Sequence, residues 1–315
     1  MKENWDELLK DYEPSTDAIK KQEPPSQGMS KRMYYALLII FGAAFLLGGA
    51  FLLGYYLENK AAEQTYSELD KLYQSGLQAT TPTTQPGTTG TGPVETQPPT
   101  ILPELEKIYE LNNDLVGYLH FDYPNLNLRF PVVQSSTSDD FYLDYDFYGR
   151  ENMSGCPYVP NHCDVFKPSD SVVIYGHNMQ SGGMFNKLTW YRKKSYWQEH
   201  QTFHFDTLYE RHTYRIFAVF KTAAMQHDAD GNPWGYPYHY MNNFQNEEEF
   251  NKFIADVKGA AFTGTNAYKG ESYYDTGITP VYGDKILCLS TCEYSMTDPD
   301  GTVNGRLVVM AVRIE

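Results

Sequence analysis

The stretch Lys285–Cys292, KILCLSTC, decides how the rest of the chain is interpreted. It concentrates apolar residues in the manner of a buried β-strand and ends at a cysteine, which is followed by Glu293 and other polar residues. A cysteine inside such a run usually fills space, whereas one at the polar end of a strand can present its thiol to solvent. The stretch therefore predicts a strand that carries an accessible thiol at its end.

Similar strand-like runs lie on both sides of this stretch, separated by clusters of Gly, Pro, Asn and Asp. They are NLRFPVV (127–133), SVVIYGH (171–177), TYRIFAVFKT (213–222) and RLVVMAVRI (306–314). Aromatic residues make up 15% of the chain, and Tyr alone occurs 27 times. Since aromatic and β-branched residues favour strands, this composition predicts a β-rich domain.

Two segments show helical spacing instead. PELEKIYELNNDLVGYL (103–119) opens with apolar residues near helical spacing, and NEEEFNKFIADVKG (246–259) begins with Asn246 as N-cap and Glu249 three residues later. The apolar residues of the second segment are Phe250, Phe253, Ile254 and Val257. We therefore expect residues 101–315 to form one mainly β domain that opens with a helix and carries a late inserted helix.

An uncharged apolar run covers residues 33–57. As a helix it would extend roughly 37 Å, enough to cross the hydrocarbon layer of a bilayer. It is too long for a cleaved signal peptide and lacks a convincing A-x-A site. Positive residues precede the run and mixed charges follow it: Lys20, Lys21, Lys31 and Arg32 before, Glu58, Lys60 and Glu63 after. This asymmetry predicts a single-pass anchor with a cytoplasmic N-terminus and the following residues outside the cell.

The chain then divides into four expected regions. Residues 1–32 form a cytoplasmic tail, 33–57 the transmembrane signal anchor, 58–100 an extracellular spacer, and 101–315 the folded domain. The spacer is rich in Thr, Pro and Gly from residue 80, a composition that cannot bury a core. We expect it to hold the folded domain away from the bilayer.

Charge and spacing exclude two classes of partner. The formal net charge is −15, so nucleic acid is not an expected ligand. His162 stands beside Cys163, but the cysteines and histidines lack the paired spacing of zinc sites, and we expect no metal.

Three segments carry side chains suited to acyl transfer: His177 just past a strand, Cys292 at a strand's end, and Arg306 at the start of the last strand. A thiolate is a strong nucleophile, an imidazole can generate it, and a guanidinium can stabilise an oxyanion. Each residue taken alone is more often structural or a surface residue. The pattern becomes a catalytic hypothesis only if the three converge.

The same segments resemble those of the sortases, most closely class B. LSTC (Leu289–Cys292) resembles the TLxTC signature, YGHNM (Tyr175–Met179) the histidine segment, and NGRLVV the strand that bears Arg306. YLDYDFYGR (142–150) is similar to a segment that class B members carry before the histidine strand. The resemblance covers the anchor, the spacer and almost all of residues 101–315.

This resemblance implies an eight-stranded β-barrel with one or more N-terminal helices and an inserted helix between strands 6 and 7. It also implies that Cys292 attacks a Thr carbonyl in a C-terminal sorting motif of a secreted protein and forms a thioacyl enzyme. An amine of peptidoglycan or its lipid-linked precursor then accepts the acyl group. His177 would transfer protons, and Arg306 with the Glu293 N–H would stabilise the oxyanion, without metal, ATP or another cofactor.

The resemblance further implies substrate contacts from Ser290, Thr291 and Glu293, and a sorting motif similar to NPxT or SPxT. Trp234 and the tyrosines of GYPYHY (235–240) are expected to border the peptide groove. Three alternatives stay open: a sortase that polymerises pilins, a peptidase that transfers the acyl group to water, and a catalytically silent wall-associated scaffold.

Two questions about cysteines also stay open. Cys156 and Cys163 enclose a short loop on the extracellular side, where a disulfide can persist, but they could also be free. Cys288 stands where the sortase signature has its first Thr, and it would either pack silently or pair oxidatively with Cys292.

Overall fold

The structure, a computed structural model, describes residues 30–79, 99–225, 227–231, 234–259, 270–298 and 300–315. The chain separates into two compact units, Met1–Gly54 and Tyr55–Glu315. Most of the residues predicted as a cytoplasmic tail, and nearly all of the Thr/Pro/Gly-rich stretch, lie outside the described residues.

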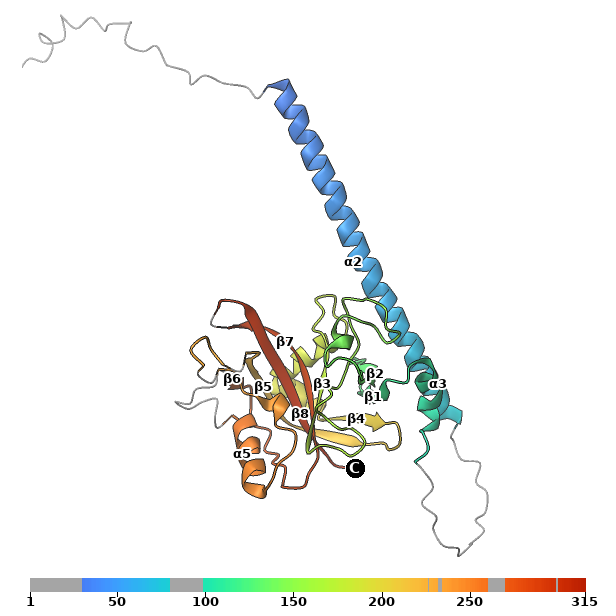
Figure 1. The fold of residues 1–315 in the computed structure, drawn as a ribbon, viewed down its shortest axis with the longest axis vertical. Helices are drawn as coiled ribbons and strands as arrows, with labels where there is room; N and C mark the ends of the chain where they lie inside the picture. The colour runs from blue at the N-terminus through green and yellow to red at the C-terminus, as the bar shows by residue number, and fades with distance from the viewer. Residues whose placement is uncertain (1–29, 80–98, 226, 232–233, 260–269, 299) are drawn as a thin grey trace, which may run out of the picture. The chain divides into compact units, whose positions relative to one another are not determined.

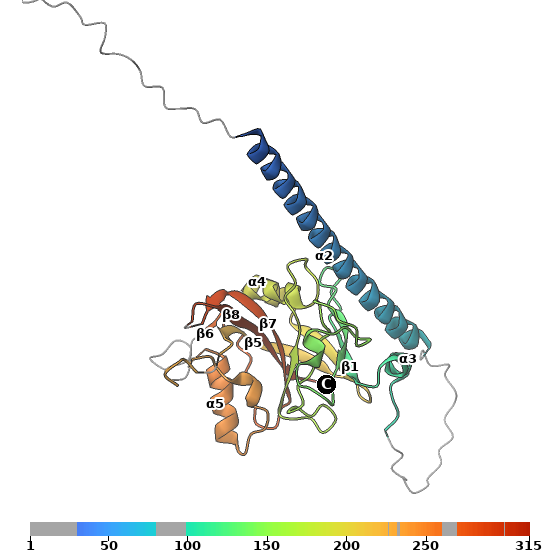
Figure 2. The same cartoon turned by 45° about the horizontal axis from the view of Figure 1, so that its top comes forward.

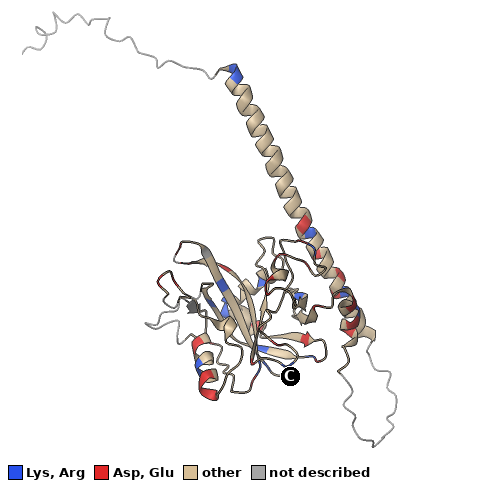
Figure 3. Ribbon diagram, in the orientation of Figure 1, with Lys and Arg blue, Asp and Glu red and all other residues tan. Residues whose placement is uncertain are grey.

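The first long element is helix α2 (Lys31–Ala79). In the described part of the chain it is the one helix long and apolar enough to cross a membrane, with a mean hydropathy of 2.6 over its best window. Figure 3 shows a length of α2 without charged residues that follows the basic residues at its start. The apolar run thus has the length, composition and helical conformation of a membrane span.

Helix α2 continues well beyond the apolar run, and its later part packs against the second unit. Ala62, Tyr66, Leu69 and Tyr73 recur at helical spacing and are buried in the core of that unit. The Tyr73 hydroxyl donates a 2.5 Å hydrogen bond to Asp206. Residues 58–79 therefore belong to the folded domain, which differs from the boundary expected from composition.

Helix α3 (Pro103–Leu111) lies beside the end of α2 (Figure 1). Gly76 makes this approach possible, because a Cβ at that position would lie 2.3 Å from the Cα of Glu104.

Among the described residues, eight strands form the body of the second unit. They are β1 (Leu115–His120), β2 (Arg129–Val133), β3 (Ser171–Tyr175), β4 (Thr202–Thr207), β5 (Thr213–Ala223), β6 (Gly270–Ser272), β7 (Ile286–Thr297) and β8 (Val303–Arg313). The order is β2-β1-β4-β5-β8-β7-β3, with β6 pairing β5 at the side. All pairs are antiparallel except β3 with β7, which is parallel.

Tyr158 joins the two ends of this order. It bridges Val133 at the end of β2 and Tyr175 at the end of β3. Reciprocal backbone hydrogen bonds of 3.1 and 2.9 Å link Tyr158 with Tyr175, and the Val159 N–H donates to the Val133 carbonyl at 2.9 Å. The sheet therefore closes into a barrel, as predicted, and the segment between Cys156 and Cys163 performs the closure.

Strand β7 is buried on both faces, which explains its almost unbroken apolar sequence. Leu287 and Leu289 belong to the larger core cluster, whereas Ile286 and Cys288 belong to a second cluster. Helix α5 (Glu247–Val257) contributes its apolar face to this second cluster. In Figures 1 and 2, α5 lies beside the end of the sheet where β5 and β6 pair.

The inserted helix is confirmed, and so is its cap, because the Asn246 side chain accepts a 3.0 Å hydrogen bond from the Glu249 N–H. The helix follows β5 and precedes the three-residue strand β6. It therefore lies one strand earlier than the predicted position between strands 6 and 7. The other helical elements are α4 (Lys194–Glu199) and the 3-10 turns η1 (Phe141–Leu143), η2 (Phe185–Arg192) and η3 (Tyr238–Tyr240).

Candidate active site

The strand register brings the three candidate catalytic residues to one end of the barrel. Tyr175 pairs with Ser290 across the parallel strands β3 and β7, so His177 and Cys292 each lie two residues beyond that pair in the same direction. Cys292 pairs with Arg306 across β7 and β8. The convergence required by the catalytic hypothesis follows from this pairing.

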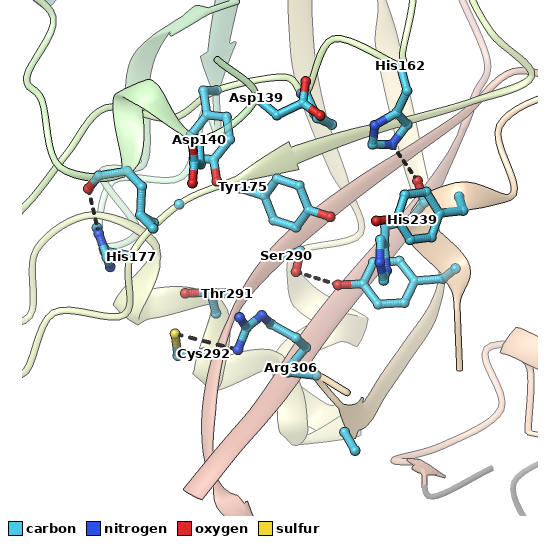
Figure 4. A pocket seen from close by; sticks show the side chains of 18 residues that line it. Asp139, Asp140, His162, Tyr175, His177, His239, Ser290, Thr291, Cys292 and Arg306 are labelled. Carbon is cyan, nitrogen blue, oxygen red and sulfur yellow. Dashed lines mark hydrogen bonds between the residues drawn. The ribbon is translucent and has the colours of Figure 1, made fainter. Parts of the chain in front are cut away.

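A cavity of about 280 Å³ lies at this end of the barrel, and His177, Cys292 and Arg306 all line it (Figure 4). Cys292 is half-buried, and its Sγ lies 4.0 Å from Nη1 of Arg306. The same Nη1 donates to Oδ1 of Asn304 at 2.8 Å and to the Gly305 carbonyl at 3.0 Å. These bonds hold the guanidinium beside the sulfur, where it can stabilise negative charge.

His177 is oriented by a backbone carbonyl. Its Nε2 lies 2.8 Å from the carbonyl oxygen of Leu143, and because a carbonyl only accepts, Nε2 carries the proton. In neutral His177 the nitrogen available to take a proton is therefore Nδ1. Gly176 lets Phe185 pack against the backbone here, since a Cβ at Gly176 would lie 2.7 Å from that ring.

Asn178 ties the histidine segment to the cysteine strand. Its Nδ2 donates a 2.8 Å hydrogen bond to the Cys292 carbonyl, and its Oδ1 accepts one of 2.8 Å from Asn186. Its own carbonyl accepts a 2.9 Å bond from the Tyr294 hydroxyl. Asn178 is 5% exposed, so these bonds lie largely out of water. Sequence reasoning missed both Asn178 and Leu143, because no local pattern marks either contact.

Two of the predicted substrate contacts line the cavity. Ser290 is fully buried, and its hydroxyl lies 2.7 Å from that of Tyr238. Thr291 is 3% exposed, and its Oγ1 has no hydrogen-bond partner among the described residues. A buried hydroxyl without a partner loses its hydration without compensation, which a peptide group entering the cavity can supply.

Glu293 is the third predicted contact. It is not among the described residues that line the cavity. By strand alternation its side chain shares the face of Leu287 and Leu289, opposite to that of Cys292. Its carboxylate accepts a 2.9 Å hydrogen bond from Nε of Arg192. Burial alone would raise the pKa of Glu293, but the Ser295 N–H and Arg192 outweigh it and hold that pKa below its ordinary value.

The other end of the cavity is formed by segments after Tyr158 and after β5. His162 donates from Nε2 to the carbonyl of His239 at 2.8 Å, and both side chains line the cavity with Tyr240. Burial, with His162 and Arg306 nearby, lowers the pKa of His239 to about 4, so that ring is neutral at pH 7. The predicted aromatic border is thus present in Tyr238 and Tyr240, whereas Trp234 is not among the described residues that line the cavity.

All four cysteines lie in the described part of the chain, and all four are free. The Cys156 sulfur lies 3.8 Å from the Pro131 carbonyl, whereas that of Cys163 accepts a 2.8 Å bond from Asn242. Cys288 is fully buried with its sulfur 3.5 Å from Oγ of Ser171, and burial raises its pKa to about 12. Cys156 and Cys163 therefore form no disulfide with each other in the structure. Cys288 packs in the core and does not pair with Cys292.

No protein-family model matches the chain. The chain is 24% identical over 211 residues to Sortase B of Staphylococcus aureus, which covers 67% of this chain and 75% of the relative. It is 25% identical over 207 residues to Sortase B of Listeria monocytogenes, which covers 65% and 74%.

Among solved structures, a Staphylococcus aureus sortase B–substrate complex superposes with a TM-score of 0.63 at 21% identity, covering 82% of this chain and 99% of the other. A sortase B complexed with triglycine gives a TM-score of 0.62 at 21% identity, with the same coverage. The structural likeness shows the sortase B fold, and the relatives with that name match about two thirds of the chain in sequence. The chain thus has the sortase B fold and is similar in sequence to class B sortases, which are cysteine transpeptidases.

Proposed function

We propose that Cys292 is the nucleophile of this transpeptidase, that His177 transfers the protons, and that Arg306 stabilises the oxyanion. The observation that carries the proposal is the single cavity lined by all three side chains, with Nη1 of Arg306 4.0 Å from the Cys292 sulfur. Nucleophile, acid–base group and oxyanion donor are the components that acyl transfer requires.

The first half-reaction forms the thioacyl enzyme. The Cys292 thiolate attacks the carbonyl carbon of the scissile peptide bond, and the resulting oxyanion faces the Arg306 guanidinium. Imidazolium at His177 gives its Nδ1 proton to the leaving amine as the C–N bond breaks. The Nε2–H bond to Leu143 is kept throughout, so the ring holds its orientation while Nδ1 gains and loses a proton.

The second half-reaction reverses these steps with another amine. The acceptor attacks the thioester carbonyl, Nδ1 of His177 takes its proton, and the Cys292 thiolate leaves as the new amide forms. The energy of the cleaved peptide bond is retained in the thioester, so neither ATP nor a metal enters the balance. Solved relatives that hold a substrate or triglycine support a peptide donor and an amine acceptor for this chain.

The donor is a secreted protein with a C-terminal sorting motif similar to NPxT or SPxT, and the acceptor is an amine of peptidoglycan or its lipid-linked precursor. The protein crosses the cell membrane once through residues 33–57, with residues 1–32 in the cytoplasm and the catalytic domain outside. Lys31 and Arg32 at the start of α2 support this orientation.

The experiment is a peptide-library cleavage assay with the protein and two amines, diaminopimelate and triglycine. A transpeptidase yields the amide of the cleaved peptide, whereas a peptidase yields only the acid and a scaffold leaves the library intact. Cys292→Ala is the control and should give neither product. An acid product alone in the presence of excess amine would overturn the assignment of the acceptor step.

A further inference from the structure

A second cavity, of about 580 Å³, lies between the docked part of α2 and the barrel, within the unit Tyr55–Glu315. We call it the juxtamembrane cavity. Its lining comes from α2, from Asn127 and the start of β2, from Ser154, and from the segment after His177 that ends at Lys187. The lining residues with polar or aromatic side chains used below are Tyr55, Tyr56, Lys60, Ser67, Ser154, Ser181 and Lys187.

Two lysines give this cavity the donors that an anion needs. Nζ of Lys60 lies 3.4 Å from the Tyr56 hydroxyl, and Nζ of Lys187 lies 3.4 Å from the Asn125 carbonyl. Neither ammonium has a carboxylate partner in the part of the chain that the structure describes. The third cation of the lining, Arg129, is different, because its Nε donates to Asp70 at 2.7 Å.

The remaining charge of the lining is modest. Asp70 is neutralised by Arg129, which leaves the carboxylate of Glu63 against the two ammonium groups. The hydroxyls of Ser67, Ser154 and Ser181 add neutral donors. Ammonium and hydroxyl donors around a polar cavity suit phosphate oxygens.

The position of the cavity along α2 indicates where such phosphates would come from. Tyr55 and Tyr56 end the apolar run, and Lys60 follows within about one helical turn. Aromatic residues at the end of a membrane span lie at the level of the lipid headgroups. The cavity residues Tyr55 and Tyr56 therefore belong to the end of the predicted membrane span, near which the phosphate groups of membrane-bound molecules lie.

The cavity also adjoins the catalytic loop. Ser181 donates a 3.1 Å hydrogen bond to Oδ1 of Asn59 on α2. The same loop is closed by a bridge between Asn178 and Met184, and Asn178 contacts the Cys292 carbonyl. One short loop thus separates the juxtamembrane cavity from the cavity that holds the thiol.

We infer that the juxtamembrane cavity binds the phosphate groups of a lipid-linked acceptor, whose amine then reaches the neighbouring active site. The inference rests on the proposed function and names the acceptor within it. Lys60 and Lys187 hold the phosphates by charge, and the serine hydroxyls donate to the remaining oxygens. Confining the acceptor beside the thioester raises the effective concentration of its amine above that of the same amine free in solution.

The test uses the full chain in phosphatidylcholine vesicles and two acceptors that carry the same diaminopimelate-containing peptide. One acceptor is linked to a polyprenyl diphosphate and the other is the free peptide. The test variant is Lys60→Gln/Lys187→Gln, and the matched control is Lys71→Gln/Lys107→Gln, which removes two exposed lysines outside the lining. Equal melting temperatures of the two variants establish that both are folded.

KM of the test variant for the lipid-linked acceptor should be at least tenfold higher than that of the wild type. A change of this size is expected when about two lysine–phosphate contacts are lost. Hydrolysis of the sorting peptide and KM for the free peptide should not change, and the control should behave as the wild type. A KM that is unchanged, or that rises equally for both acceptors, overturns the inference while leaving the proposed function intact.

A second arm adds phosphatidylglycerol to the vesicles. If the cavity holds general anionic headgroups instead, this lipid competes and removes the difference between the two acceptors in the wild type, which also overturns the inference. A wild type that forms no amide with either acceptor contradicts the proposed function itself.

Discussion

Asn178 donates from Nδ2 to the Cys292 carbonyl at 2.8 Å, so the residue after the proposed catalytic histidine is hydrogen-bonded to the backbone of the proposed nucleophile. The bond links the segment after β3, which carries His177, to strand β7, which carries Cys292. These two side chains must keep a fixed geometry during acyl transfer. Because Asn178 does not contact the sulfur or the imidazole, we expect it to act as a positioning residue.

Asn178→Ala should lower kcat about tenfold with little change in KM, because misplaced reacting groups slow the chemical step more than substrate binding. Steady-state kinetics with a sorting peptide measure both constants. Tyr294→Phe is the matched control, since it removes only the 2.9 Å bond to the Asn178 carbonyl and should have a smaller effect. An unchanged kcat for Asn178→Ala would show that the hydrogen bond between Asn178 and the Cys292 carbonyl has no catalytic consequence.

Arg306→Ala should lower kcat by about 10²- to 10³-fold, the usual loss for one oxyanion donor. Arg306→Lys keeps the positive charge but loses the guanidinium, whose Nη1 donates to Asn304 and lies beside the sulfur, so it should recover only part of the activity. Kinetics and a melting curve on each variant separate catalysis from folding. Full activity in Arg306→Ala would remove the oxyanion role.

Glu293 makes stability depend on pH in a predictable direction. Its pKa in the folded protein lies below the ordinary value near 4.3, so the ion pair with Arg192 stabilises the fold above that pH. The stabilisation is lost as pH falls through the lowered pKa. The melting temperature of the wild type should therefore fall more steeply below about pH 4.3 than that of Glu293→Gln. Parallel curves for the two proteins would contradict this role.

Only one thiol of the folded protein should react quickly with iodoacetamide. Cys156, Cys163 and Cys288 are buried with raised pKa values, whereas Cys292 lines a cavity. Mass spectrometry of the folded protein should find a single modified site, at Cys292, and four sites after denaturation. Rapid modification of Cys288 in the folded state would show that the second core cluster opens.

The docked part of α2 should contribute to stability. A soluble protein that begins at residue 58 should melt at a higher temperature than one that begins at residue 101, because the longer protein retains Tyr66, Leu69 and Tyr73 in its core. Tyr73→Phe in the longer protein should cost about 1 to 3 kcal/mol, since it leaves buried Asp206 without its hydroxyl donor. Equal melting temperatures of the two proteins would mean that the helix does not dock.

The barrel strands, the helix capped by Asn246 and the convergence of His177, Cys292 and Arg306 could be predicted from the sequence. Strand and helix patterns are local, and the family resemblance supplied the pairing that brings the three residues together. Closure of the barrel by Tyr158 and orientation of His177 by Leu143 could not, because each depends on a backbone contact between irregular segments. Such contacts leave no periodic pattern in the sequence.

Two further differences have physical causes. Composition predicts a spacer from residue 58, whereas burial of the apolar face of residues 58–79 depends on the barrel surface that packs against it, which no local pattern reveals. The family resemblance implies that Glu293 contacts the substrate, yet strand alternation turns its side chain to the opposite face, where Arg192 neutralises it.

The most direct test of Cys292 as the acylated nucleophile is the intact mass of the protein after mixing with a sorting peptide and rapid acid quenching. The mass should increase by that of the acyl fragment, and peptide mapping should place the addition on Cys292. Cys288→Ala should acquire the same mass, and hydroxylamine should remove it, as expected for a thioester. Cleavage of the peptide with no added mass, or acylation that persists in Cys292→Ala, would contradict the proposed chemistry.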